Sequence, residues 1–330
     1  MKNCPSNKIL NPTTNRCVLK SGLIGKKLLK SYLNNKCNKI KLNWENNSCY
    51  IDSLLVALFI NKDKFINTYL LKADLIDYGN STLKIIGEKI REALIKIYEI
   101  INNDNYQNNS ITCANLRLLL NNYYKILKTI KKVKLIGNND NWLNTQNDVF
   151  ELFEFLKLIF DLKNTTKFID ANNPPNFTDF SVLLPIDFLL DTSKPLKISK
   201  IYPITKIKYD LNDANKFNGK NYYYKTTEIL KADKLFIKIY RNIGSMKLET
   251  KIIPAKSLKL KENDFKLHLT SIIIHYGSNN SGHYICLYCC NKIWYEYNDM
   301  ARKVNKIGSL KDICNNHNYI SNIVGLIYSK

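Results

Sequence analysis

Hydrophobic residues in the first half of the chain recur at the spacing of a helix. Between positions 49 and 59 they return every three or four residues, and Asn47 and Ser48, both good N-cap residues, precede the run. Positions 83–101 show the same period with charged residues on the opposite side, and a third run follows Asp148. The pattern predicts helices at Cys49 to Phe59, Leu83 to Ile101 and Val149 to Leu162, within a helical region from 41 to 161.

The pattern changes after Asp179, where the period shifts towards two and β-branched residues become more frequent. This alternation is typical of strands. It predicts strands at 181–188, 235–241, 269–276, 284–290, 292–297 and 323–328. Helices first and strands afterwards indicate an α+β fold.

The composition supplies enough apolar surface for a folded core. Of 330 residues, 45% are hydrophobic and 11% aromatic, which excludes global disorder. The longest apolar runs, such as Leu54 to Ile60, are much shorter than the ~20 residues of a membrane span, and the first residues lack the apolar stretch of a signal peptide. We therefore expect a soluble, intracellular protein with no membrane partner.

The chain is also strongly basic. Lysine and arginine number 50 against 28 acidic residues, for a formal net charge of +22, which is a reason to consider nucleic-acid binding. The lysines are spread along the chain together with Asn, Ile and Tyr, as expected of a genome rich in A and T, and the sequence holds no zinc finger or RNP-like signature. Nucleic-acid binding is kept as an alternative hypothesis, and we do not expect nucleic acid to be the partner.

Two of the nine cysteines bracket a short N-terminal segment. Cys4 and Cys17 enclose turn-forming residues, and so small a unit buries little core, so a disulfide or paired thiols would help to hold it. The segment CPSNKILNPTTNRCV, followed by GKKLL, resembles the two-cysteine adaptor domain of large DNA viruses. The resemblance implies a docking or localising module at residues 1–35 that binds a viral or host protein.

Other cysteines fall in a strand-like run near the C-terminus. Cys286, Cys289 and Cys290 are predicted to be small core residues. Cys286 and Cys289 form a C-x-x-C pair, but the sequence has no second pair to complete a zinc site. We therefore expect no metal and no cofactor.

One cysteine and one histidine, far apart in sequence, carry the candidate chemistry. Cys49 opens a predicted helix, where the partial positive charge of the helix N-terminus favours the thiolate and lowers the pKa of the thiol. His283 stands just before a strand, and Asn298 and Asp299 follow the next strand, where either can orient the second ring nitrogen. This order of residues fits a papain-like scheme, with the backbone N–H of Cys49 and nearby Asn amides as donors to an oxyanion.

Five segments, in the same order along the chain, resemble the ubiquitin-specific protease family. NNSCYIDSLLVALF resembles its Cys box, and HYGSNNSGHYICLY with WYEYND resembles its His box. TQNDVFELFEFL resembles the segment between the boxes, KLFIKIYRN with KIIPAKSL the strand pair before the His box, and IVGLIYS the closing strand. The resemblance implies a catalytic domain at 41–330 with the papain-like α+β fold: a helical thumb, a β-rich palm and reduced fingers without zinc.

The resemblance also implies roles for individual residues. Cys49 would be the nucleophile, His283 the general base and Asn298 the third catalytic residue, with Asp299 as its rival. The other implied positions are Asn43 and Asn47 at the oxyanion, and Gln146, Asp148, Glu151, Gly282 and Tyr284 at the substrate. The Arg-containing tail of ubiquitin suits Asp148 and Glu151, because carboxylates are strong acceptors for a guanidinium. Taken alone, both acids are explained equally well as negative charges that complement the N-terminus of a helix.

Two departures from the family pattern stand out, and the second is the absence of the finger cysteines. The first bears on the modifier that is recognised. Trp44 stands where most of the family has an oxyanion-binding Asn, and Asp52 follows the cysteine, which leans towards the SUMO-directed relative of the family. The tail of SUMO lacks the Arg that Asp148 and Glu151 would bind. These two acids therefore favour ubiquitin.

The combined features predict a thiol-dependent deubiquitinase, a cysteine-type isopeptidase that acts on ubiquitin or its conjugates through a thioester. The resemblances place it in the host cytoplasm or the virion of a large DNA virus. The alternatives are a protease for SUMO or another ubiquitin-like modifier, and a catalytically weak module that binds ubiquitin without cutting it. Because the tail of ubiquitin is basic, we expect the excess positive charge to lie away from an acidic slot at Asp148 and Glu151.

Overall fold

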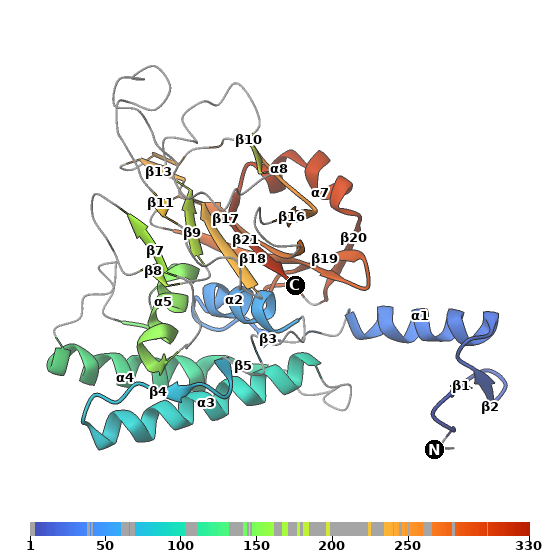
Figure 1. Cartoon of the computed structure of the whole chain (residues 1–330), viewed down its shortest axis with the longest axis horizontal. Coiled ribbons are helices and arrows are strands. Elements are labelled where there is room, and N and C mark those ends of the chain that lie inside the picture. Colours follow the sequence, from blue (N-terminus) through green and yellow to red (C-terminus); the bar gives the residue numbers. More distant parts are fainter. Residues whose placement is uncertain are drawn as a thin grey trace.

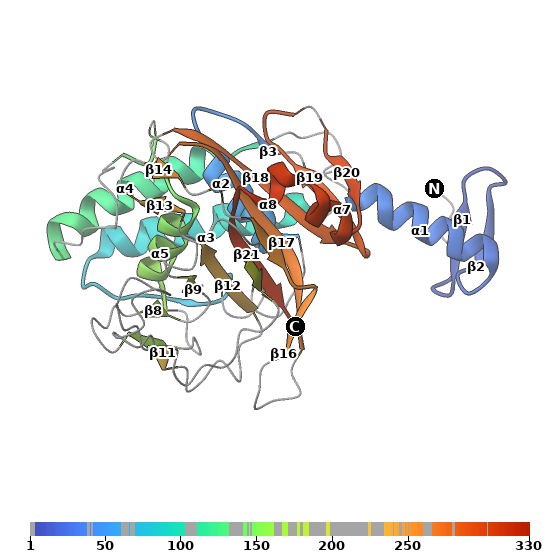
Figure 2. The same cartoon turned by 90° about the horizontal axis from the view of Figure 1, so that it is seen from above.

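The computed structural model of the chain describes residues 4–37, 40, 42–60, 66, 70–102, 111–131, 141–143, 145, 147–161, 167–170, 177–178, 181–184, 196–198, 224–225, 234–239, 241–243, 246–247, 249, 251–259, 266–278, 281–301 and 303–330. These residues form an α+β fold, in which a large twisted sheet carries helices on both of its faces (Figures 1 and 2).

The helices lie mainly in the first half of the chain. They are α1 (Leu23–Cys37), α2 (Cys49–Phe59), α3 (Ser81–Asn102), α4 (Ala114–Lys131), α5 (Val149–Ile159), α7 (Leu310–Asn315) and α8 (His317–Ile320). The main sheet comes from the second half. Its strand order is β20 (Asn305–Gly308), β19 (Ile293–Tyr297), β18 (Gly282–Cys290), β17 (Lys266–Gly277), β21 (Ile323–Ser329), β12 (Lys234–Ile239) and β9 (Ser181–Leu184), with β16 (Ser257–Lys259) also paired to β17.

Neighbouring strands of the main sheet are antiparallel, except that β9 pairs with β12 in parallel. Short strands form small sheets around it. These are β1 (Lys8–Asn11) with β2 (Arg16–Leu19), β3 (Leu42–Asn43) with β5 (Ile111–Thr112), β4 (Asp74–Leu75) with β6 (Phe160–Asp161), β7 (Lys167–Asp170) with β8 (Phe177–Thr178) and β11 (Tyr224–Lys225), β10 (Leu196–Ile198) with β15 (Ile252–Pro254), and β13 (Asn242–Ile243) with β14 (Met246–Lys247).

The main sheet is buried on both faces, which explains why β18 is an almost continuous apolar run. Cys286 and Tyr288 pack into the core that contains α2, whereas Ile285 and Leu287 pack into a second core with residues of α7 and α8. Successive side chains of a strand point to opposite faces, so a strand between two cores needs apolar residues at every position.

Helix α2 is the central helix of the domain. All of its side chains are buried, as expected for a helix that is hydrophobic on every side. It lies between the sheet and the helices α3 and α5 (Figures 1 and 2). Ser271 of β17 donates its hydroxyl to the carbonyl of Ala57 at 3.1 Å, which ties the helix to the sheet. This packing brings the first turn of α2 against β18.

The N-terminal segment forms a hairpin, β1 and β2, followed by α1, and extends away from the rest of the molecule (Figure 1). A disulfide joins Cys4 to Cys17. A second disulfide joins Cys37, at the end of α1, to Cys290, at the end of β18. Cys286 is a buried free thiol, as predicted. Cys290 is half-buried against the same core, and it forms a disulfide that the sequence did not predict, because β18 ends beside the C-terminus of α1.

Most of the predicted elements are confirmed, with small differences at their ends. Helix α2 has the predicted bounds, whereas α5 ends at Ile159 because the backbone becomes extended at Phe160 and continues into β6. The predicted strand at 181–188 is described as far as Leu184, and the rest lies outside the described residues.

The region of the predicted fingers, 185–233, is described only at β10 and β11. Within the described part of the chain, no group of His, Cys, Asp and Glu is arranged to hold a metal ion. The helices that are described include none with the length and hydropathy needed to cross a membrane.

Candidate active site

Cys49 stands at the start of α2, after a turn with an uncommon backbone. Asn46 and Asn47 adopt left-handed conformations, with φ of 46° and 65°, which asparagine tolerates better than most residues. The amide of Ser48 donates to the carbonyl of Glu45 at 3.1 Å and closes this turn. The helix therefore begins at Cys49, whose side chain is only 2% exposed.

The environment of the Cys49 thiol keeps it protonated. Burial raises its pKa to about 11, the backbone N–H groups of Tyr284 and Tyr50 lower it, and the charges of Asp299 and Asp52 raise it. The sequence predicts a lowered pKa from the helix N-terminus alone, and this prediction is wrong because desolvation outweighs the helix dipole. The thiol needs a proton acceptor before it can act as a nucleophile.

His283 lies at the beginning of β18, in the hairpin that β18 forms with β17. Its backbone pairs with that of Tyr276, and Gly282 pairs with Gly277. A Cβ atom on Gly282 would collide with the carbonyl of Tyr276 and the ring of His275, so a larger residue at this position would displace the strand that carries His283. The sequence predicts a glycine here because a substrate approaches. The structure adds a second reason, which is the lack of space for a Cβ atom.

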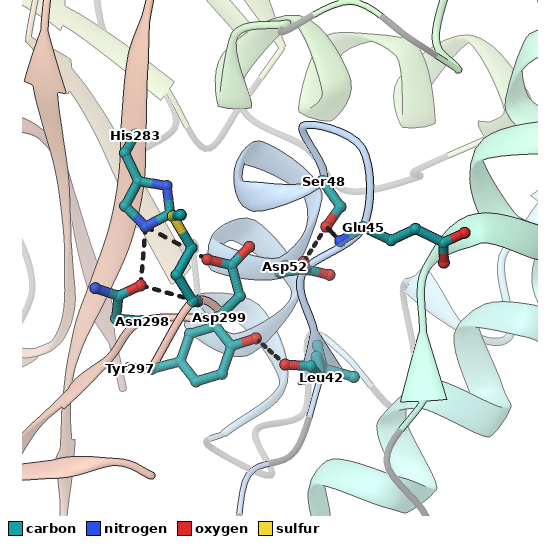
Figure 3. Close-up of polar contacts among 9 residues, drawn as sticks. Leu42, Glu45, Ser48, Asp52, His283, Tyr297, Asn298 and Asp299 are labelled. Atoms are coloured by element: carbon teal, nitrogen blue, oxygen red, sulfur yellow. Dashed lines mark hydrogen bonds and ion pairs between the residues drawn. The ribbon is translucent and has the colours of Figure 1, made fainter. Parts of the chain in front are cut away.

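The two residues after β19 both face the imidazole of His283 (Figure 3). Nε2 lies 2.9 Å from Oδ1 of Asn298 and 3.4 Å from Oδ1 of Asp299. The backbone N–H of Met300 also donates to Oδ1 of Asn298, at 3.0 Å, and holds this amide in place. When Nε2 donates to Asn298, the proton-accepting nitrogen is Nδ1, which Figure 3 shows on the opposite side of the ring.

Two hydrogen bonds join the end of β19 and the residues after it to the segment before Cys49. The N–H of Trp44 donates to the carbonyl of Asp299 at 3.4 Å, and the hydroxyl of Tyr297 donates to the carbonyl of Leu42 at 2.9 Å. These contacts hold together two parts of the chain that are about 250 residues apart in sequence.

Asp148 and Glu151 lie at the N-terminus of α5. Asp148 is the N-cap, and its Oδ1 accepts from the N–H of Phe150 at 2.7 Å. The hydroxyl of Tyr284, next to His283, donates to its Oδ2 at 3.3 Å. Burial raises the pKa of Glu151 to about 7, and the charge of Asp148 contributes. The acidic pair is therefore connected to β18 at the residue that follows the candidate base.

A lysine that the sequence did not point to approaches this acidic pair. Nζ of Lys238, from β12, lies 3.7 Å from Oδ1 of Asp148 and 4.7 Å from the centre of the Phe150 ring. The slot predicted at Asp148 and Glu151 therefore holds one basic side chain as well, which the two acids outnumber. The pairing of strands β12 and β21 brings this lysine beside α5, and no local sequence motif marks it.

The remaining predicted positions lie around the same region or outside the described residues. Asn43 is exposed in β3, Asn47 is exposed in the turn before Cys49, and the Trp44 side chain is 42% exposed. Gln146 lies outside the described residues.

Asp52 is a further site residue. Its place one helical turn after Ser48 could have indicated the hydrogen bond that Ser48 Oγ donates to Asp52 Oδ2 at 2.6 Å.

These features are typical of one class of enzyme. A thiol at a helix start, an imidazole on a neighbouring strand and a carboxamide behind the imidazole are the parts of a papain-like cysteine hydrolase. Residues 159–320 match the model of the ubiquitin carboxyl-terminal hydrolase family. The match supports a thiol-dependent hydrolase of ubiquitin with a papain-like α+β fold. Among curated proteins, no relative matches the chain.

The matched range contains one part of the candidate site. It includes His283, Asn298 and Asp299, and it begins after Cys49 and the acidic pair. Cys49 and the acidic pair lie outside the matched range, and they reach the site because α2 and α5 pack in the same core as β18.

Proposed function

We propose that the chain is a viral deubiquitinating cysteine protease, which cleaves the bond after the C-terminal glycine of ubiquitin. The observation that carries the proposal is the pairing of His283 Nε2 with Asn298 at 2.9 Å, beside a helix that begins with Cys49. The family match at 159–320 supports ubiquitin as the modifier. We also propose that it acts in the host cytoplasm or in the virion.

In the proposed reaction, Nδ1 of His283 accepts the proton of the Cys49 thiol, and the thiolate attacks the carbonyl carbon of the C-terminal glycine. The tetrahedral intermediate collapses when the imidazolium gives its proton to the leaving amine, and a thioester remains. A water molecule, deprotonated by the same imidazole, then attacks the thioester and releases the ubiquitin carboxylate and the thiol. Asn298 holds the ring in the required tautomer throughout.

The buried thiol is compatible with this reaction because the imidazole, rather than solvent, accepts its proton. Removal of water around a nucleophile and its base also strengthens their mutual attraction, which favours the ion pair once substrate is bound. Asn43, Asn47 and the backbone N–H of Cys49 are the proposed donors to the oxyanion. Asp148 and Glu151 are the proposed acceptors for the Arg of the ubiquitin tail.

A second candidate function is the same reaction on SUMO or another ubiquitin-like modifier. It is favoured by Lys238, which lies 3.7 Å from Asp148 and opposes the binding of an Arg side chain there. Trp44 and Asp52, which depart from the ubiquitin-directed pattern, point in the same direction.

The test is parallel labelling with activity probes that carry ubiquitin or SUMO and an electrophile at the C-terminal glycine. We expect the ubiquitin probe to label the wild-type protein and to leave Cys49→Ala unlabelled. Labelling by the SUMO probe alone assigns the second function. A wild-type protein that binds ubiquitin and reacts with neither probe is a binding module, and the catalytic proposal is then wrong.

A further inference from the structure

Two aspartates lie buried behind the imidazole of His283. Asp52, in the first turn of α2, is 0% exposed, and the side chain of Asp299 is also 0% exposed. Figure 3 shows the carboxyl group of Asp299 between the imidazole ring and Asp52. Two carboxyl groups this close to the reacting groups need a physical explanation, because a buried charge is costly unless it is compensated.

The two carboxyl groups have too few hydrogen-bond donors. Ser48 Oγ donates to Oδ2 of Asp52 at 2.6 Å, but within the described structure Oδ1 of Asp52 and both carboxyl oxygens of Asp299 have no donor at hydrogen-bonding geometry. The Cys113 thiol near Asp52 and the backbone N–H groups of Asp299 and Met300 near Asp299 still lower the pKa of these two carboxyl groups. Two ionised carboxylates cannot bond to each other, because each only accepts. One shared proton removes the conflict, since a protonated carboxyl group donates to its neighbour.

The surroundings indicate which carboxyl group holds the proton. Burial raises the pKa of Asp52 well above its usual range and the charge of Asp299 raises it further, while hydrogen bonds from Cys113 and Ser48 oppose the rise without cancelling it. Burial also raises the pKa of Asp299, but the side chain of Asp52 and the imidazole of His283 oppose this rise. Because Nε2 lies 3.4 Å from Asp299, the negative charge is more stable on Asp299 and the proton on Asp52.

Other titratable groups face this pair from α2, from β19 and from the start of α4. The thiols of Cys49 and Cys113 and the phenol of Tyr297 all have pKa values raised by burial, so they are neutral near pH 7. The guanidinium of Arg117 donates to main-chain carbonyls, among them that of Trp142 at 3.0 Å, instead of to a carboxylate. Of the groups around this pair, the imidazole of His283 is therefore the one that can take up a positive charge beside Asp299.

We propose that Asp52 and Asp299 share one proton and carry one negative charge between them, and that Asp52 thereby acts as a positioning residue for His283. By donating to Asp299, Asp52 fixes that carboxylate behind Nε2. There the carboxylate stabilises the imidazolium that forms when Cys49 loses its proton. The inference rests on the proposed role of His283 as the base.

The test measures the protonation of His283 directly, in the absence of any substrate. The chain has four histidines, so the spectrum of ¹³C-labelled imidazole groups is simple, and His283→Gln identifies the signal. A Cys49→Ala background removes the coupled titration of the thiol. In this background, the isosteric variants Asp52→Asn and Asp299→Asn are compared by the midpoint pH of the His283 signal.

We expect Asp299→Asn to lower the midpoint, because the variant loses the opposite charge that lies 3.4 Å from Nε2. Asp52→Asn should move it by less than about 0.3 pH unit, because its amide donates to Asp299 and the pair keeps one negative charge. A midpoint lowered by Asp52→Asn as much as by Asp299→Asn would overturn the proposal. An unchanged midpoint in both variants would overturn it as well.

Infrared spectroscopy provides a second test that does not depend on the folding of an aspartate variant. At neutral pH, a Glu151→Gln protein should show the C=O band of a protonated carboxylic acid, and Asp52→Asn should remove it. Absence of the band in the folded Glu151→Gln protein refutes the shared proton. Failure of the proposed function would instead show in the probe labelling of Cys49, which neither measurement uses.

Discussion

Lys238 should weaken the binding of a basic modifier tail, and its removal should therefore improve catalysis. The perturbation is Lys238→Met, which removes the charge 3.7 Å from Oδ1 of Asp148 and keeps an apolar chain over the Phe150 ring. With that charge gone, Asp148 is left to the Arg of the substrate. Because the interaction is made with the bound substrate before any bond changes, we expect the effect mainly in KM.

The magnitude follows from the distance and the exposure of the two side chains. Two unit charges at 3.7 Å attract by roughly 1 kcal/mol in bulk water and by about 4 to 5 kcal/mol at an effective dielectric constant of 20. The exposed fractions of Lys238 and Asp148 are 17% and 36%, so solvent screens the pair, and measured pairs near the surface lie at about 0.2–1 kcal/mol. We expect KM to fall by up to about fivefold.

The assay is steady-state hydrolysis of a fluorogenic amide of ubiquitin. Lys157→Met is the matched control, because Lys157 also lies near a phenylalanine ring and pairs with Glu154 at 2.7 Å, in the same helix as Asp148. It should leave KM unchanged. In Asp148→Asn, the further change Lys238→Met should no longer lower KM. An unchanged or higher KM in Lys238→Met, or an equal fall in Lys157→Met, would refute the reasoning.

Three further predictions concern pH, the proposed partner of His283 and the disulfide. Burial raises the pKa of Glu151 to about 7, so its negative charge is present above that pH and lost below it. KM for ubiquitin should therefore fall as pH rises from about 6 to 8, and Glu151→Gln should flatten this change. Asn298→Ala should lower kcat by about 10²–10⁴-fold. Asn298→Asp keeps an acceptor for Nε2, so its kcat should fall less. An equal fall of kcat in both variants would contradict the role of the amide. Cys290→Ser should lower the free energy of unfolding by up to about 5 kcal/mol in denaturant titrations without reductant. Cys314→Ser, at a free and partly exposed thiol, should leave it nearly unchanged. Equal effects of the two variants would contradict the disulfide.

The elements that could be predicted from the sequence are those with a strong local pattern. Helix α2 is apolar at nearly every position, with Asp52 and Ser53 as the exceptions, so its bounds follow from the residues alone. The apolar runs rich in β-branched and aromatic residues at the end of the chain likewise predict β17, β18, β19 and β21. The end of α5 could not be predicted, because Phe160 leaves the helix to pair β6 with β4, a contact made far away in sequence.

The same limit applies to the candidate site. Cys49, His283 and Asn298 stand in local motifs that mark the chemistry they could carry. Lys238 and the pair formed by Asp52 and Asp299 acquire their significance only from neighbours in space. The pKa of Cys49 is the sharpest example, since the helix start predicts a lowered value and burial, which depends on the whole core, raises it to about 11.

The disulfide between Cys37 and Cys290 gives the molecule a covalent topology that the backbone alone does not have. The chain between these residues, whose sequence separation is 253, is a closed ring, and the N-terminal hairpin is attached to that ring at Cys37. A protease that cuts any single peptide bond within the ring opens it and leaves one covalent molecule. Whether a cut just after Cys37 frees the N-terminal segment is therefore decided by the redox state of the solution, and a gel run with and without reductant would display the difference.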